Sequence, residues 1–293
     1  MKPLLNAQNV SVIIPALNES QHIARLLGRL RAMSNVGEIV VCDGGSVDET
    51  REIAQSFGAR VVACQANRGA QMNAGASVMH GDILWFLHAD SLPPRSGAKR
   101  IVAACNRQST HRVLGVRAKP IIGGNFRLRF GSPSSINNRK RERAGLMQQC
   151  HTARALPLAV VEMISFSIFA SDVFNSQLVA ANLFAIVARV LRSCGVYYGD
   201  SGIWMRRDVF EKIGGFQNWP LFEDLEMARQ LELFARQNGC KTICIAPPIV
   251  VSSRRFGSST RSATKLLARW AKLQTLFWLG VAPETLAKMY RGR

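Results

Sequence analysis

The sequence predicts an α/β fold with a mostly parallel sheet flanked by helices, followed by amphipathic helices at the C-terminus. Two observations carry this prediction. Short apolar runs alternate with helical patterns up to Asp90, which is typical of a parallel sheet with right-handed crossovers. Further along, Phe126, Leu128 and Phe130 alternate with two arginines. This period of two indicates a half-buried strand, which we expect to be antiparallel.

The first half contains four short apolar runs of the length expected for buried strands. They cover Val10–Pro15, Glu38–Cys42, Ala59–Cys64 and Asp82–Leu87. Helical patterns fill the gaps between them. The first begins at the capping residues Asn18, Glu19 and Ser20, and the others span Glu49–Phe57 and Gly69–Met79.

The second half is less regular. We expect helices at Arg95–Cys105 and from Phe222 to about Arg236, and one or two apolar helices in Leu156–Leu191. Short strands are expected at Ile203–Met205, after a turn at Gly199–Gly202, and at Lys241–Ala246. The polar segment Gly131–Arg154 is a loop or a partly disordered insertion. We expect one domain over residues 8–260, with an insertion at about 132–170. Residues 261–293 should form a basic amphipathic helical extension.

The charge balance points to anionic partners. Lysine and arginine number 38 against 19 acidic residues, a formal net charge of +19, which suits phosphates, an acidic membrane surface or nucleic acid. No recognised nucleic-acid module accompanies the charge, so we expect no nucleic-acid partner. The seven cysteines lack zinc-site spacing, which favours a reduced, cytoplasmic protein. The longest apolar stretches, Leu156–Ala170 and Leu178–Leu191, contain polar interruptions and are too short to span a membrane.

Acidic residues follow three of the predicted strands. Glu19, Asp43 and Asp90 come after the first, second and fourth strands, and the carboxyl ends of parallel strands share one edge, where ligands bind. Asp43 precedes two glycines and either makes a tight turn or accepts a hydrogen bond from a base or a ribose. Asp90 either caps the following turn or holds Mg²⁺ or Mn²⁺ against a diphosphate.

Several segments together resemble a known family. VSVIIPALNES, VVCDGGSVDET, RGAQMNAGA, FLHAD, YGDSGIWMRRDVFEKIGGF, PLFEDLEMARQL and the ending from SRRFG to LAKMY are similar to the family 2 inverting glycosyltransferases of the GT-A (Rossmann-like) fold. The resemblance covers nearly the whole chain except about 132–170. It is closest to the bacterial subgroup named after arsenosugar biosynthesis.

The resemblance implies roles for particular residues. Those expected to line the donor site are Pro15, Asn18, Glu19, Asp43 (to the base), Arg68, Asn73, Glu223, Arg254 and Arg255 (to the diphosphate). Asp90 matches the last residue of the metal-binding D-x-D motif, and His88 replaces its first Asp, although a neutral imidazole can also bind Mn²⁺. Asp224 matches the catalytic base. The donor is expected to be a UDP-sugar, and the acceptor a small molecule or a lipid.

The residue types suit this chemistry. An inverting transfer needs a carboxylate that takes the proton of the acceptor hydroxyl, and positive charge on the departing diphosphate. Asp224 could instead be an ordinary first-turn acid on a solvated face with Glu223 and Glu226. Gly199 and Asp200 form either a simple turn or part of an acceptor pocket.

The C-terminal helix leaves two alternatives open. Lys265, Arg269 and Lys272 fall on its polar side, which makes either a solvated face or a helix lying in a membrane interface. In the second case Trp270, Phe277 and Trp278 would insert into the lipid at the inner face of the cell membrane. Two other function classes also remain. A nucleotidyltransferase should carry a glycine-rich loop after the first strand, which PALNES lacks. The other class is a catalytically silent nucleotide-sugar or anion-binding protein.

Overall fold

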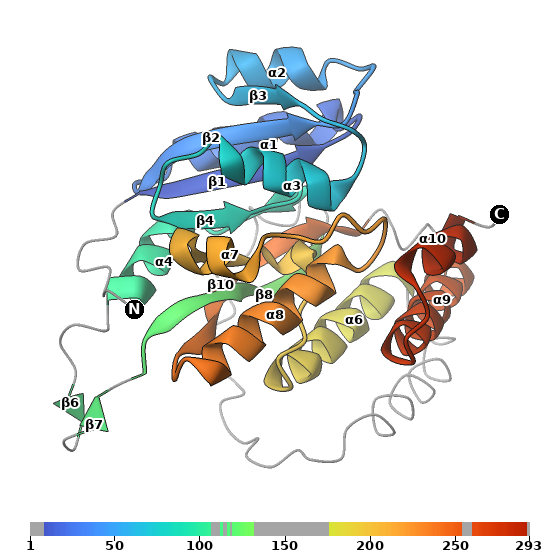
Figure 1. Cartoon of the computed structure of the whole chain (residues 1–293). Helices are drawn as coiled ribbons and strands as arrows, with labels where there is room; N and C mark the ends of the chain where they lie inside the picture. The colour runs from blue at the N-terminus through green and yellow to red at the C-terminus, as the bar shows by residue number, and fades with distance from the viewer. Residues whose placement is uncertain are drawn as a thin grey trace.

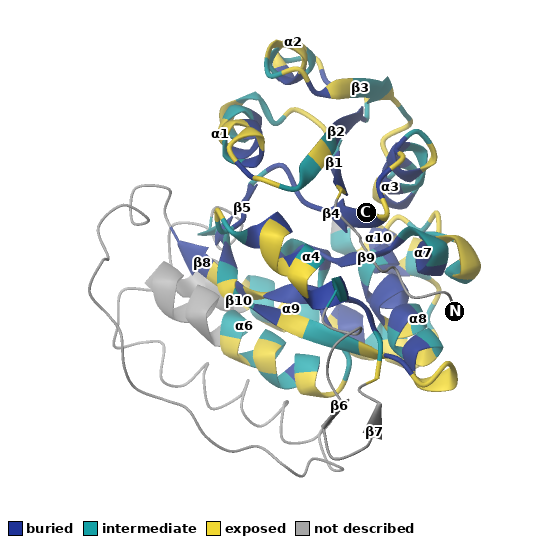
Figure 2. Cartoon of the chain, turned by 90° about the vertical axis from the view of Figure 1, so that its left-hand side faces the viewer, coloured by how far each residue is buried: buried dark blue, intermediate teal, exposed yellow. Residues whose placement is uncertain are grey.

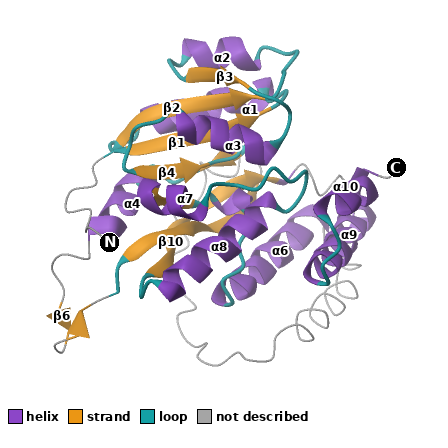
Figure 3. Cartoon of the chain, in the orientation of Figure 1, coloured by secondary structure: helices purple, strands orange, loops and turns teal. Residues whose placement is uncertain are grey.

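The computed structural model describes residues 9–106, 112–113, 116–117, 119–131, 176–253 and 260–291. The predicted insertion at 132–170 and the pair Arg254 and Arg255 lie outside these residues. The described chain forms an α/β structure around one eight-stranded mixed sheet, with helices against both of its faces (Figure 1, Figure 3). The predicted fold class is therefore confirmed.

The sheet has a parallel half and a mixed half. Its strands, in spatial order, are β3 (Arg60–Ala63), β2 (Val36–Asp43), β1 (Val10–Ala16), β4 (Ile83–Phe86), β9 (Trp204–Arg206), β8 (Ile121–Gly131), β10 (Lys241–Ser252) and β5 (Ser91–Leu92). The first four strands run parallel. Strand β9 is antiparallel to both neighbours, and β8 runs parallel to β10. A separate small pair joins β6 (Arg112–Val113) and β7 (Val116–Arg117).

Two apolar layers hold the helices on the sheet. One layer contains buried residues of α1 (Ser20–Arg31), α2 (Thr50–Ser56) and α4 (Gly97–Asn106), and α6 (Ser176–Ser193) packs against it. The other contains residues of α3 (Arg68–Ser77), α7 (Arg207–Ile213) and α8 (Glu223–Gln237). The central strands are buried on both faces (Figure 2), as continuous apolar runs predict. Trp85 and Trp204 are fully buried, and Trp85 stacks on Phe126 with ring centroids 5.3 Å apart.

The C-terminal helices pack on the protein. Helices α9 (Thr260–Trp278) and α10 (Pro283–Arg291) share an apolar cluster with the start of α8. Within it, the rings of Trp270 and Phe277 lie 5.7 and 4.9 Å from that of Phe222. Two of the three aromatic residues expected to insert into a membrane are thus committed to internal contacts, and only Trp278 stays exposed. Among the described residues, no helix has the length and apolar character needed to cross a membrane.

Three details differ from the expectations. Strand β10 does not end at Pro247 but continues to Ser252, because a register shift between Ile245 and Ile249 takes the two prolines out of the ladder with β8. Strand β8 is antiparallel only to β9 and parallel to β10. Helix α7 was not expected, although Gly214, in the left-handed conformation at its C-cap, is a typical stop signal.

Candidate active site

The carboxyl edge of the parallel strands is where the candidate site forms. Strands β1, β2 and β4 end there, on the side of the molecule where α9 and α10 lie (Figure 1). The first turns of α3 and α8 reach the same edge, since Arg68 and Glu223 form an ion pair across it at 3.2 Å. A single 3₁₀ turn, η3 (Gly199–Ser201), completes the edge by contacting Asp224. Strand ends and helix N-termini together favour anionic ligands.

A cavity of about 310 Å³ opens at this edge. Its lining residues are Pro15, Ala16, Leu17, Glu19, Ala66, Asn67, Arg68, Gln71, His88, Ala89, Asp90, Pro220 and Glu223. Six of these residues are ones that the sequence predicted, namely Pro15, Glu19, Arg68, His88, Asp90 and Glu223. We call this space the larger cavity. It joins the ends of β1 and β4 to the starts of α3 and α8.

The pair of Arg68 and Glu223 is the main charged contact of the larger cavity. Glu223 is 2% exposed, whereas the Arg68 side chain is 43% exposed. Burial raises the pKa of Glu223, and nearby Asp224 raises it further, while Arg68 opposes both. Burial alone would lower the pKa of Arg68, but the nearby carboxylates of Glu223, Asp224 and Asp200 outweigh it and raise the pKa. Arg68 therefore stands at the centre of an acidic cluster, with part of its side chain open to a ligand.

His88 and Asp224 meet at η3. The Nδ1 atom of His88 lies 2.6 Å from Oδ1 of Asp200. On its other side, Nε2 lies 2.9 Å from the place where a Cβ on Gly199 would stand, and Oδ2 of Asp224 lies 3.2 Å from the same place. The amide of Gly199 donates to Oδ2 of Asp224 at 2.7 Å, and the amide of Leu225 donates to Oδ1 at 2.8 Å. Asp224 is thus fixed by two backbone donors in the first turn of α8.

A second, smaller cavity of about 60 Å³ adjoins the first. Arg68 and His88 line both. The other residues of the smaller cavity are Phe130, Phe184, Tyr198, Asp200, Leu221, Phe222, Asp224, Leu266, Leu267 and Trp270. Apolar and aromatic side chains make up most of this lining. Asp200 and Asp224 line this smaller cavity but not the larger one.

Three predicted site residues hold loops instead of lining either cavity. Asp43 is fully buried and accepts from the amides of Gly45 and Ser46 and from Arg51 Nε at 2.5 Å. Burial alone would raise the pKa of Asp43, but the hydrogen bonds from Ser46 and Arg51 outweigh it and lower the pKa. The side-chain oxygen of Asn18 accepts from the amide of Val47.

Asn73 is the third of these residues. Its side chain donates to Phe216 O and accepts from Phe216 N, both at 2.8 Å. It therefore ties α3 to the segment that leads into α8. The pair Arg254 and Arg255 lies outside the described residues, so its place relative to the cavities is not defined.

Sequence reasoning missed several residues of the site. Gln71, in the same RGAQMNAGA segment, donates from Nε2 to Ala16 O and Cys42 O at 3.0 and 2.7 Å and so joins the ends of β1 and β2. The only local signal was a glutamine between Ala70 and Met72, and it gave no indication that its amide would join two strands. The apolar lining from Tyr198 and Phe222 had no local signal, since it depends on how α6, α8 and α9 pack together.

Replacing Gly199 tests how tightly this site is packed. A Cβ at this position would stand 2.9 Å from His88 Nε2 and 3.2 Å from Asp224 Oδ2, and both groups are held by other contacts. We expect Gly199→Ala to displace Asp224 or His88, with turnover reduced by about 10²-fold, as for a misplacement of about 1 Å. Steady-state kinetics would measure this, with Gly28→Ala as a control for glycine loss, because a Cβ at Gly28 in the interior of α1 would meet only Phe57 Cε1, at an ordinary contact distance of 3.5 Å. Equal losses in both variants would contradict the packing argument.

Replacing Glu223 tests the protonation of the buried acid. A carboxyl whose pKa is raised on folding holds its proton more tightly in the folded chain, so the free energy of unfolding falls as pH rises above the ordinary glutamate value of about 4.3. We expect Glu223→Gln to make the free energy of unfolding change less between pH 5 and pH 8 than in the wild type. Urea unfolding at both pH values measures this, with exposed Glu211→Gln as control. An identical pH slope in Glu223→Gln and the wild type would contradict it.

Solved structures and protein families place this arrangement in a known class. The chain aligns with a mannosyltransferase from Pyrobaculum calidifontis, solved with GDP-Man and Mn²⁺, with a TM-score of 0.51 and 16% identity, covering 94% of this chain and 66% of that one. It aligns with residues 1–349 of S. aureus TarS with a TM-score of 0.50 and 15% identity, covering 90% and 64%. These likenesses show a GT-A-like α/β fold.

The family follows from sequence. The model of glycosyl transferase family 2 matches residues 11–160, about half of the chain, and the chain therefore belongs to this family. It is 36% identical over 119 residues to an undecaprenyl-phosphate 4-deoxy-4-formamido-L-arabinose transferase of Edwardsiella ictaluri. It is 32% identical over 124 residues to a 4,4'-diaponeurosporenoate glycosyltransferase of Staphylococcus haemolyticus. The matches cover 36% and 39% of this chain, and it spans only 37% and 33% of the length of these relatives.

Proposed function

We propose that the protein transfers a sugar from a nucleotide-diphosphate sugar to an acceptor hydroxyl with inversion. The observation that carries this proposal is the pair of adjoining cavities that share Arg68 and His88. The larger one offers the volume and the strand-edge position suited to a nucleotide donor. The smaller one presents the Asp224 carboxylate. A donor on one side and an acceptor on the other would bring the anomeric carbon and the hydroxyl together near His88.

The donor half of the proposal rests on Asp90, Glu19 and Arg68, which line the larger cavity. We assign the Arg68 guanidinium, partly exposed there, to the diphosphate, where a fixed positive charge stabilises the departing group. A UDP-sugar is the proposed donor. The complex of one structural neighbour with GDP-Man and Mn²⁺, together with the family membership, supports a nucleotide sugar in general.

We propose that a divalent cation binds in the larger cavity through Asp90 and the phosphates of the donor together. No cluster of three or more acidic, histidine or cysteine residues that could hold a metal occurs in the part of the chain that the structure describes. Mg²⁺ commonly binds through one or two carboxylates together with substrate phosphates, so Asp90 would hold Mg²⁺ or Mn²⁺ only with the donor present. The cation would neutralise diphosphate charge. His88 binds Asp200 through Nδ1, the pairing common for metal-bound histidines, but its Nε2 faces Gly199, so we assign it a positioning role first.

The acceptor half of the proposal rests on Asp224. Its carboxylate sits in the first turn of α8 and accepts hydrogen bonds from two backbone amides. An ionised carboxylate can take the acceptor proton as the hydroxyl oxygen attacks the anomeric carbon. Asp200 faces the same cavity and would orient the acceptor hydroxyl or His88.

The lining of the smaller cavity favours a lipidic acceptor over a polar one. Phe130, Phe184, Leu266 and Trp270 surround the Asp224 side, and apolar walls suit an acceptor with an apolar group beside its hydroxyl. Relatives named for undecaprenyl-phosphate and diaponeurosporenoate agree with this class. We also propose a cytoplasmic protein that meets an anionic membrane peripherally, supported by the net charge of +19.

Two finer assignments remain part of the proposal. One is the division into a transferase domain over residues 8–260 and a helical extension over 261–293. The other is membership of the arsenosugar-type subgroup, which rests on the sequence motifs alone. The relatives found by comparison are varied members of the family.

A donor-consumption assay tests the proposal. The full chain would be incubated with UDP-glucose, UDP-N-acetylglucosamine and GDP-mannose, with and without Mn²⁺ and a polyprenyl phosphate. We expect Mn²⁺-dependent release of nucleoside diphosphate from at least one donor. Nucleotide binding without consumption would favour the silent binding protein. Pyrophosphate release from a nucleoside triphosphate and a sugar 1-phosphate would instead indicate a nucleotidyltransferase.

A further inference from the structure

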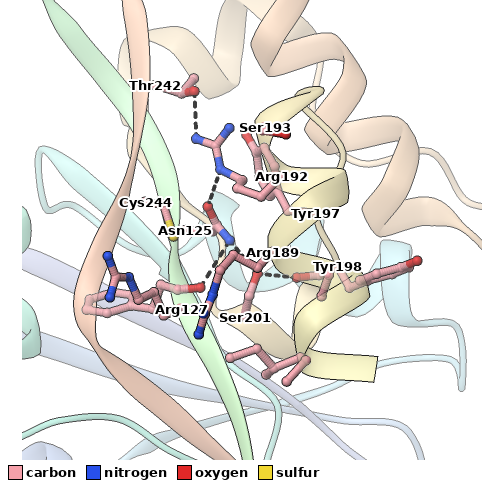
Figure 4. A pocket seen from close by; sticks show the side chains of 14 residues that line it. Asn125, Arg127, Arg189, Arg192, Ser193, Tyr197, Tyr198, Ser201, Thr242 and Cys244 are labelled. Atoms are coloured by element: carbon pink, nitrogen blue, oxygen red, sulfur yellow. Dashed lines mark hydrogen bonds between the residues drawn. The ribbon is translucent and has the colours of Figure 1, made fainter. Parts of the chain in front are cut away.

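A third cavity lies outside the two described above. It occupies about 400 Å³ between α6 and the strands β8 and β10. Figure 4 shows arginines from both sides around it, Arg127 from β8 and Arg189 and Arg192 from α6. We call it the arginine cavity. It is larger than either cavity of the candidate active site, and the proposed transfer reaction gives it no role.

One of the three arginines is part of the wall. Arg192 donates from Nε to Asn125 Oδ1 at 2.6 Å, from Nη1 to Glu232 Oε1 at 3.1 Å and from Nη2 to Thr242 Oγ1 at 2.9 Å. Its guanidinium also stacks over the Tyr197 ring at 4.5 Å. These contacts occupy hydrogen-bond donors on three nitrogens of the guanidinium, and the Glu232 carboxylate compensates its positive charge. Arg192 therefore fixes the back of the cavity and is not free to bind a ligand.

The other two arginines remain available. Arg127 and Arg189 are exposed, and neither forms an ion pair with a carboxylate within the described residues. Both arginines lie near the Cys244 thiol. Burial raises the pKa of this thiol, and the positive charges of Arg192, Arg127 and Arg189 oppose the rise. Arg192 is thus paired with Glu232, whereas Arg127 and Arg189 have no carboxylate partner in the part of the chain that the structure describes.

The remaining wall of the cavity is largely apolar. Ala185 and Ala188 stand on the same face of α6 as Arg189 and Arg192, by helical spacing, and their small side chains leave room beside the strands. Leu128 of β8 lines the opposite side, whereas the ring of the neighbouring Phe126 is fully buried against Trp85. A ligand with both an anionic group and an apolar group would match this surface, since arginines bind phosphate and carboxylate through paired donors.

The arginine cavity also touches the candidate active site. Tyr198 lines both the arginine cavity and the smaller cavity. Asn125 accepts a hydrogen bond from Arg192 and donates one to Ser201 Oγ at 3.0 Å. Ser201 is the residue after Asp200, which contacts His88. A ligand in the arginine cavity would therefore contact Ser201 of η3 and the adjacent Tyr198.

We propose that the arginine cavity is a second binding site, for an organic anion in which a phosphate or a carboxylate is attached to an apolar group. Arg127 and Arg189 bind the anionic group, and Leu128, Ala185 and Ala188 contact the apolar group. Arg192 holds the frame through Asn125. Binding here does not depend on the transfer reaction, so the site is open to test even if the donor proves to be different.

Calorimetric titration of the full chain tests this site. The probes are hexyl phosphate, hexanoate, inorganic phosphate and neutral hexanol. We expect hexyl phosphate or hexanoate to bind more tightly than inorganic phosphate or hexanol, and the stronger of the two identifies the anionic group. Arg127→Gln combined with Arg189→Gln should weaken that binding at least about tenfold, the usual worth of charge-assisted hydrogen bonds. Both side chains are exposed, so this variant should fold.

Two controls make the outcome specific. Arg129→Gln removes an exposed arginine of β8 that does not line the cavity, and Arg68→Gln alters the larger cavity. Both should retain binding of the preferred probe. Loss of binding in Arg129→Gln to the same extent as in the double variant would mean only general attraction to a basic surface. Loss of probe binding in Arg68→Gln alone would mean that the anion binds in the larger cavity and not in the arginine cavity. Either outcome, or equal binding of all four probes, would overturn the proposal.

Discussion

Asp224→Asn should lower turnover by about 10²–10⁴-fold, the usual contribution of a positioned general base. The wild-type carboxylate accepts from the amides of Gly199 and Leu225 at 2.7 and 2.8 Å, and it lies in the first turn of α8, where the helix dipole favours negative charge. Asparagine keeps the size of the side chain but cannot take a proton. Its NH₂ group would also face one of the two amides, so a stability loss of about 1 kcal/mol should accompany the change.

Two measurements separate the catalytic effect from a structural one. Nucleotide affinity of Asp224→Asn should stay near that of the wild type, because Asp224 does not line the larger cavity. Glu226→Gln is the matched control in the same helical turn. Its carboxylate pairs with Arg229 at 2.6 Å and lines neither active-site cavity, so its turnover should not change. Preserved turnover in Asp224→Asn, or a parallel collapse of donor affinity, would exclude Asp224 as the base.

Asp90→Asn should remove the dependence of UDP binding on Mn²⁺. Asp90 lines the larger cavity after β4, and an amide is a poorer ligand for a hard cation than a carboxylate. We expect UDP affinity in the presence of Mn²⁺ to fall roughly 30-fold or more, the effect of removing one partner of a close charge contact. In EDTA the wild type and the variant should bind UDP equally.

The matched control for this change is Asp82→Asn. Asp82 is exposed just before β4, at the opposite end of the same strand, and lines neither active-site cavity. Its variant should keep the full effect of Mn²⁺. Since one carboxylate gives a weak site, Mn²⁺ alone should bind much less tightly than Mn²⁺ with UDP. An unchanged Mn²⁺ effect in Asp90→Asn would remove this residue from the metal site.

Local sequence predicted the parallel half of the fold well and the mixed half less well. Strands such as β1 and β4 are continuous apolar runs, and their helices carry regular spacing, so each element has its own signal. Strand β10 did not, because two prolines at Pro247 and Pro248 indicated an end that the register shift avoids. The direction of β8 depends on which strands flank it, and local periodicity carries no information on that.

The candidate site was predicted in part for a similar reason. Asp90, Glu19 and His88 follow strand ends, and strand ends meet at one edge, so their convergence could be foreseen. Asp43 and Asn73 make hydrogen bonds to nearby turns and loops, and their expected roles toward the donor stay predictions. The apolar wall of the smaller cavity comes from α6 and α9, which are distant in sequence and meet only through tertiary packing.

Nucleotide binding to the full chain is the most direct test of the central claim, that the larger cavity holds a nucleotide-diphosphate sugar. Thermal unfolding would be followed with UDP, GDP and their sugars, each with Mn²⁺ and with EDTA, because a ligand that binds only the folded state raises the midpoint temperature. The account predicts a rise with at least one nucleotide sugar that requires Mn²⁺ and is lost in Asp90→Asn. No rise with any nucleotide, in either condition, would contradict it.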